Sequence, residues 1–159
     1  ERGILFMINT TGMQGYFQRA IAKGLLPRWI VVAANPMISY PGQGTKMYEV
    51  REIEDKAKNT GTVMRAHSIS PNKAIIMGDS GGDGPHFEWA AEVGAHLVGS
   101  MTKPSLEKYC KGKGIEIGTR FGVTYSEGEK RDTAREMEVD FMGLVAVVER
   151  VMKENHKER

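Results

Sequence analysis

Residues 74–87 read Ala-Ile-Ile-Met-Gly-Asp-Ser-Gly-Gly-Asp-Gly-Pro-His-Phe. Four apolar residues precede a glycine-rich turn, and Pro85 opens a second apolar run with helical spacing. This order predicts a strand, a loop and a helix of a parallel sheet, and proline is favoured in the first turn of a helix. Asp79 and Asp83 are therefore expected where the carboxyl end of a strand meets the amino end of a helix.

These two aspartates are the candidate site. Ligands of open α/β sheets bind at the carboxyl edge of the strands, and carboxylate oxygens there suit Mg²⁺. A structural alternative stays open, in which Asp83 caps the helix and Asp79 fixes the turn through its own backbone.

The remaining apolar runs alternate between strand and helix patterns, which predicts an α/β fold. Strands are expected at residues 3–8, 29–34, 95–100 and 115–117, and residues 118–130 are interpreted as a loop. Helices are expected from Met13 to about residue 23, after a cap at Asn59 or Thr60, from Pro85 and Pro104, and over about 132–155. The last helix carries an apolar stripe (Met137, Phe141, Leu144, Val145, Val148 and Met152) that would face either the core or a partner helix.

Composition limits the classes of function. The chain has 159 residues, of which 40% are hydrophobic and 26% charged, as in ordinary globular domains. The net charge of +2 comes without a basic stripe, so we expect no nucleic-acid partner. No apolar run approaches the roughly 20 residues of a membrane span, so no membrane partner is expected. A single cysteine favours a reducing compartment, and we expect a cytoplasmic location.

Three motifs, taken in order, resemble those of the haloacid dehalogenase (HAD) superfamily. An apolar strand leads to Thr10 or Thr11, a lysine follows, and residues 78–83 then supply Gly-Asp and a second Asp. Lys58 fits the lysine motif best, and Lys56 and Lys46 remain as alternatives. The resemblance extends over about residues 3–105.

The resemblance implies a fold and a reaction. The fold would be a single core domain over residues 1–159, with a three-layer, Rossmann-like parallel sheet and helices on both faces. The reaction would be Mg²⁺-dependent hydrolysis of a small phosphorylated substrate through an aspartyl-phosphate intermediate. The implied roles are metal binding for Asp79 and Asp83, phosphate binding for Thr10, Thr11 and Gly12, and catalytic contacts to the phosphoryl group for Thr10 and Lys58.

One motif of the family is missing. No Asp-x-Asp occurs in the chain, so the nucleophile is not present, and the central strand that carries it in the family is missing too. Because the sequence starts at Glu1 without a methionine, we expect an incomplete amino terminus. A complementing amino-terminal segment or a second chain would supply the strand, or the sheet would close over the gap. The alternative function is a non-catalytic Rossmann-like module that binds a phosphorylated ligand or a partner.

Overall fold

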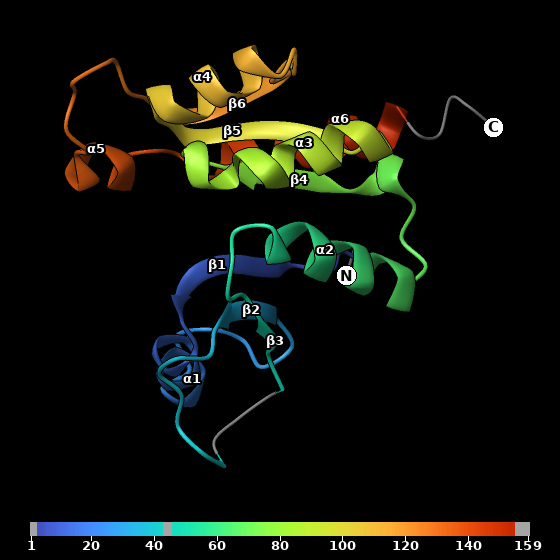
Figure 1. The fold of residues 1–159 in the computed structure, drawn as a ribbon, viewed down its shortest axis with the longest axis vertical. Coiled ribbons are helices and arrows are strands. Elements are labelled where there is room, and N and C mark those ends of the chain that lie inside the picture. The colour runs from blue at the N-terminus through green and yellow to red at the C-terminus, as the bar shows by residue number, and fades with distance from the viewer. Residues whose placement is uncertain (1–2, 43–45, 155–159) are drawn as a thin grey trace. The chain divides into compact units, whose positions relative to one another are not determined.

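The computed structural model describes residues 3–42 and 46–154 (Figure 1). The chain divides into two compact units, Glu1–Arg65 (unit 1) and Ala66–Arg159 (unit 2), and each is described by itself. Each unit contains a three-stranded parallel sheet with helices. The predicted α/β class is therefore confirmed, although the described strands form two sheets where one was expected. The single core domain and its absent central strand stay predictions.

Unit 1 is built on the sheet β1-β2-β3. Its elements are β1 (Met7–Met13), α1 (Gln14–Ala22), β2 (Val31–Asn35), β3 (Tyr48–Glu49) and α2 (Asp55–Ala66). Helix α1 contributes Ile21 and Phe17 to an apolar cluster with Ile30, Val32 and Ala34 around β2. Alternate residues of β2 share this face, as the period of a strand requires.

The first strand begins and ends later than the sequence predicts. The prediction was residues 3–8, whereas β1 runs from Met7 to Met13. Met7 pairs with Val31, the first residue of β2, so residues 3–6 precede the paired register, although the Phe6 carbonyl oxygen accepts a hydrogen bond from the Val31 N–H at 3.1 Å. As a consequence Thr10 and Thr11 lie within the strand, and α1 begins only at Gln14.

Unit 2 is built on the sheet β4-β5-β6. Its strands are β4 (Ile75–Gly78), β5 (His96–Thr102) and β6 (Thr119–Thr124). Its α-helices are α3 (Gly84–Val93), α4 (Pro104–Gly112), α5 (Thr133–Met137) and α6 (Met142–Glu154), and short 3-10 turns lie at Pro71–Lys73 and Gly81–Asp83.

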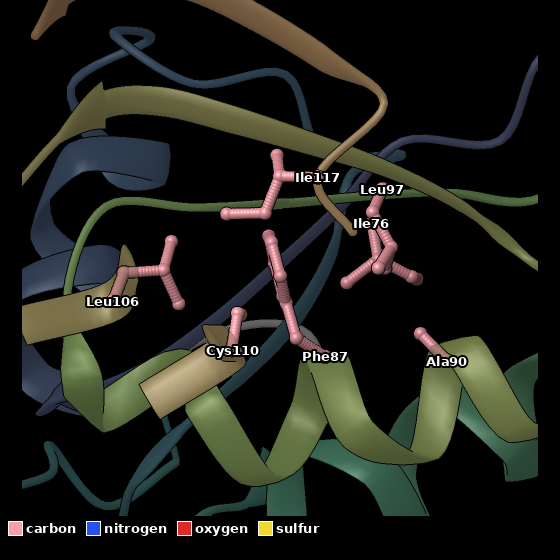
Figure 2. Packing of buried hydrophobic residues seen from close by; sticks show 7 residues of the cluster. All are labelled: Ile76, Phe87, Ala90, Leu97, Leu106, Cys110 and Ile117. Atoms are coloured by element: carbon pink, nitrogen blue, oxygen red, sulfur yellow. The ribbon is translucent and has the colours of Figure 1, made fainter. Parts of the chain in front are cut away.

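Helices cover both faces of this second sheet. Leu97 of β5 belongs to a buried cluster with Phe87 of α3 and Leu106 of α4, and Figure 2 shows Phe87 at the centre of that cluster. The next residue, Val98, is buried on the opposite face, where Leu144 and Val147 of α6 pack. Successive side chains of a strand point to opposite faces, so the sheet of unit 2 is covered by helices on both sides.

Two sequence predictions in unit 2 are wrong. Residues 115–117 are not a strand; the edge strand is β6, within the segment interpreted as a loop. The long helix over about 132–155 is two helices, α5 and α6, and residue 155 lies outside the described residues. The second helix has a cap of its own. Asp140 Oδ1 accepts a hydrogen bond at 2.9 Å from the N–H of Met142, the first residue of α6, so α6 begins as a separate helix.

Candidate functional site

Asp83 holds together the turn between β4 and α3. Its Oδ2 accepts hydrogen bonds from the backbone N–H groups of Asp79 (2.9 Å) and Ser80 (3.4 Å), and the residue is 9% exposed. The approach is so close that a Cβ on Gly78 would lie 2.7 Å from the Asp83 Cβ. Asp83 occupies the cap position of α3, but its side chain makes no cap hydrogen bond to that helix, so the predicted helix cap is absent. The carboxylate instead closes the turn before α3 in a capping box with Ser80, and this close approach explains why glycine precedes Asp79.

Asp79 is placed differently, because its carboxylate is partly exposed. Its Oδ2 accepts a hydrogen bond from Lys103 Nζ at 2.7 Å, and the two side chains are 35% and 32% exposed. The Lys103 backbone N–H also donates to the Asp79 carbonyl oxygen at 2.7 Å. No described residue is a hydrogen-bond partner of Asp79 Oδ1. Lys103 therefore fixes the orientation of the carboxylate through Oδ2, and Oδ1 can bind a ligand.

Lys103 is a residue of this site that sequence reasoning missed. It follows the last residue of β5, so it lies at the carboxyl end of the strand next to β4. Two residues earlier, Met101 has a φ of +50° at an irregularity in the pairing of β5 with β6. A bulky residue in this conformation is rare, and such irregularities redirect the chain beside functional sites. The sequence contained one signal for this residue, a lysine directly after an apolar strand.

A second group of charges follows β6. Arg131 donates to both carboxylate oxygens of Glu136, and the Tyr125 hydroxyl donates to Glu136 Oε1 at 3.0 Å. The hydrogen bonds from Arg131 lower the pKa of Glu136, with a smaller contribution from the charge of Lys103. Burial raises the pKa of Tyr125. These residues extend the polar edge of the sheet from β4 across β5 to β6.

The predicted phosphate-binding residues lie in unit 1. Thr10 Oγ1 accepts a hydrogen bond from the Gly12 N–H at 3.1 Å, so the hydroxyl and the amide are bonded to each other. The amino end of α1 has no side-chain cap, since Met13 occupies the cap position. Thr11 and Gly12 are exposed. The turn therefore presents polar groups near the carboxyl end of β1, although not in the strand–loop–helix order that the sequence predicted.

The three alternative lysines differ in burial. Lys58 is 74% exposed and pairs with Asp55 Oδ1 at 3.0 Å, three residues earlier in α2. Lys46 is exposed, whereas Lys56 is only 7% exposed in the first turn of α2. Its carbonyl oxygen accepts a hydrogen bond from Asn9 Nδ2 of β1 at 2.8 Å. The surroundings of Lys58 are those of a surface lysine, and a buried lysine such as Lys56 is costly unless it is paired.

Two buried polar atoms have no hydrogen-bond partner among the described residues: Asn9 Oδ1 and Thr102 Oγ1. Unpaired polar atoms in a protein interior are rare. Asn9 lies in β1 one residue before Thr10, and Thr102 is the last residue of β5, one before Lys103. Each unit thus has an unsatisfied acceptor beside its candidate residues.

The structure brings Asp79 and Asp83 together on one loop of unit 2, while Thr10 and Lys58 belong to unit 1. Assembly of all four residues into one site stays a prediction. Across residues 3–42 and 46–154, no three or more His, Cys, Asp or Glu side chains form a group that could hold a metal ion. In the same residues, no helix has the length and apolar character needed to span a membrane.

Comparison with known proteins gave no relative. No family model matches the chain, and neither a curated protein nor a solved structure was found to be similar to it.

Proposed function

We propose that the chain is part of a Mg²⁺-dependent phosphohydrolase of the HAD type, acting on a small phosphorylated substrate. The observation that carries this proposal is the placement of Asp79. It follows the carboxyl end of a parallel strand, on a turn fixed by Asp83, with one oxygen held by Lys103. Ligands of α/β folds bind at this edge, and partly exposed charged groups on a rigid scaffold are typical of functional sites.

The donor set fits Mg²⁺ better than a softer or more fully coordinated metal. Mg²⁺ is bound by one or two carboxylates and completes its shell with water and substrate phosphate oxygens. Asp79 would be the principal ligand through Oδ1. Asp83 would contribute mainly by holding the turn, because its Oδ2 already accepts two backbone N–H groups. The ion would offset negative charge on the phosphoryl group.

Phosphate contacts are proposed for unit 1. Thr10, Thr11 and the Gly12 N–H offer hydroxyl and amide donors, which would release their mutual hydrogen bond to bind a phosphoryl oxygen. For the cationic role, burial favours Lys56 over Lys58, which the sequence had ranked first. A buried ammonium group is the more effective one in offsetting phosphoryl charge, since electrostatic interactions strengthen away from water.

The nucleophile is proposed to come from a strand outside these 159 residues. Among the described strands β1 pairs only with β2, and β4 pairs only with β5, so each keeps one open edge. At the start of each strand two successive apolar residues, Met7 and Ile8 in β1 and Ile75 and Ile76 in β4, place apolar side chains on both faces, as in the interior of a parallel sheet. We propose that an additional strand carries the aspartate nucleophile, and that the protein acts in the cytoplasm.

The test is turnover of p-nitrophenyl phosphate by the natural full-length protein, with Mg²⁺ and with EDTA. We expect activity that EDTA abolishes and that falls at least 100-fold in Asp79→Asn. Asp132→Asn is the matched control, because asparagine caps a helix as well as aspartate does. Equal activity in Asp79→Asn and Asp132→Asn would contradict the proposal.

A non-catalytic module is the second candidate. It is favoured by the absence of Asp-x-Asp from the chain and by the use of Asp83 to hold the turn. In this case inorganic phosphate would raise the unfolding temperature of the full-length protein, and no substrate would turn over at any concentration of Mg²⁺.

A further inference from the structure

The carboxyl-terminal helix α6 has apolar side chains on two opposite faces. Leu144, Val147 and Val151 face the protein, where the first two pack on the cluster around Val98 and Phe121 and Val151 is 4% exposed. On the other side Met142 is 70% exposed, Met152 41% and Val145 38%. Exposed apolar residues that gather into one patch mark interaction surfaces.

The exposed apolar residues of α6 lie on one side of the helix. Val145 and Met152 follow Met142 by three and ten residues, which are spacings between the a and d positions of a coiled coil. Glu149 lies at the remaining position of this register and is only partly exposed. Phe141, 58% exposed and in edge contact with Phe121, extends the apolar surface beyond the first turn. We call Phe141, Met142, Val145 and Met152 the α6 stripe.

Charge at the two ends of α6 indicates the orientation of the partner. Asp140 caps the amino end, and Lys153 lies in the last turn. Two parallel copies of this helix would bring Asp140 next to Asp140 and Lys153 next to Lys153. Two antiparallel copies would place Lys153 of each beside Asp140 of the other, and would also oppose the helix dipoles favourably.

We infer that the α6 stripe is a homodimer interface, in which α6 packs antiparallel against α6 of a second copy around a two-fold axis. The axis crosses the pair at the height of Val147 along the helix, on the opposite side from that residue, so Met142 of one copy faces Met152 of the other. Such an isologous contact uses the same patch on both copies. The four-residue break before α6 frees the amino end of the helix for this contact. The inference is independent of the proposed phosphohydrolase activity.

The first experiment is sedimentation equilibrium of the wild-type protein and of Met142→Glu. We expect the wild type to have twice the mass of one chain, which is 17.6 kDa for these 159 residues. Met142→Glu should be a monomer with an unchanged circular dichroism spectrum, because the side chain is exposed in one copy. Met137→Glu is the matched control, since Met137 is 86% exposed but lies outside the stripe; it should remain a dimer. A monomeric wild type, or a dimer that survives Met142→Glu, would overturn the inference.

The second experiment fixes the orientation by disulfide cross-linking. Within one helix Met142 and Met152 are about 15 Å apart, too far for a disulfide, which requires Cα atoms within about 7 Å. An oxidised mixture of Met142→Cys and Met152→Cys should give covalent dimers, whereas each variant alone should give at most one-tenth as much. The native Cys110 is 2% exposed and will not compete. Cross-linking of Met142→Cys with itself would indicate parallel helices and contradict the antiparallel interface.

Discussion

Helices α2 and α3 begin in the same way, although they belong to different units. In each, an aspartate Oδ2 accepts hydrogen bonds from the N–H groups three and four residues earlier. The donors are Arg51 and Glu52 for Asp55, and Asp79 and Ser80 for Asp83. These bonds tie the start of each helix to the turn that precedes it, as the acidic residue of a capping box does. The same local device therefore fixes the lysine-bearing helix of unit 1 and the aspartate loop of unit 2.

Helix α1 begins without this device. No side chain caps it, and Thr10 and Gly12 only bond to each other. The comparison indicates that Asp79 is held before any ligand arrives, whereas the groups near Thr10 must rearrange to bind one. The following predictions test that difference between the β4–α3 turn and the carboxyl end of β1.

The largest effect is expected in the core behind the β4–α3 turn. Phe87 is fully buried between α3, α4 and the sheet (Figure 2). Phe87→Ala should lower the free energy of unfolding by about 3–5 kcal/mol through lost burial and the cavity that remains. Urea denaturation measures it, with Phe6→Ala as the control, because Phe6 is half exposed. A cost below about 1 kcal/mol would mean that this core does not support the turn.

The next effect distinguishes the glycines of the two turns. A Cβ on Gly78 would lie within 3 Å of both Asp83 and Phe87, so Gly78→Ala should destabilise the protein by about 1–3 kcal/mol. The matching change at the carboxyl end of β1 is Gly12→Ala. Its Cβ would be at ordinary contact distance, 3.4 Å or more, so the cost should stay within about 0.5 kcal/mol. If urea denaturation gives the same loss of unfolding free energy for both variants, the two glycines do not differ in this way.

Two substitutions of Asp83 can distinguish its role in holding the turn from its proposed role in binding the metal. Asp83→Ala should cost about 0.5–1.5 kcal/mol, because the N–H groups of Asp79 and Ser80 lose their acceptor, whereas Asp83→Asn should cost less because the amide oxygen can still accept them. Thermal unfolding gives the stability, and Mg²⁺-dependent turnover of the full-length protein gives the metal role. Activity that is lost in Asp83→Asn at unchanged stability would support a metal contact, whereas unchanged activity would assign Asp83 to the turn alone.

The smallest effect concerns the capped helix of unit 1 and depends on pH. The backbone hydrogen bond from Glu52, then Lys58, then the Arg51 N–H lower the pKa of Asp55 from 3.8 to about 2. A carboxylate with a lowered pKa stabilises the fold above its unfolded value and loses that contribution as pH falls. The stability difference between wild type and Asp55→Asn should therefore shrink between pH 4 and pH 2. Urea midpoints across this range measure the difference, and Lys58→Met should reduce it in part. A constant difference would show that the carboxylate charge is not what matters.

The sequence predicted correctly those strands and helices whose ends are determined by neighbouring residues. The strand, turn and helix at residues 74–93 were placed to within about a residue, because Gly78, Asp83 and Pro85 act on their immediate neighbours. The start of β1 was misplaced because it depends on where β2 begins, more than 20 residues later. The break before α6 was missed since Met137 and Phe141 keep helical spacing across it, and only the Asp140 cap marks it.

For the candidate site, the sequence predicted the aspartate loop but not its partners. Lys103 reaches Asp79 because β5 lies beside β4 and because Met101 adopts a left-handed conformation. Neither fact is encoded in a motif. Likewise Lys58 and Lys56 cannot be separated by spacing alone, and only the packing of α2 shows that Lys56 is the buried one.

The contact between α3 and α4 restricts which residues can stand at position 84. A Cβ on Gly84 would lie 2.5 Å from the ring of Tyr109, whose hydroxyl is bonded to Glu88 at 2.7 Å. A side chain at position 84 therefore requires the ring at position 109 to move or to be replaced by a smaller group, whereas position 109 can change by itself. We expect homologues of this chain to combine a larger residue at position 84 only with a smaller one at position 109.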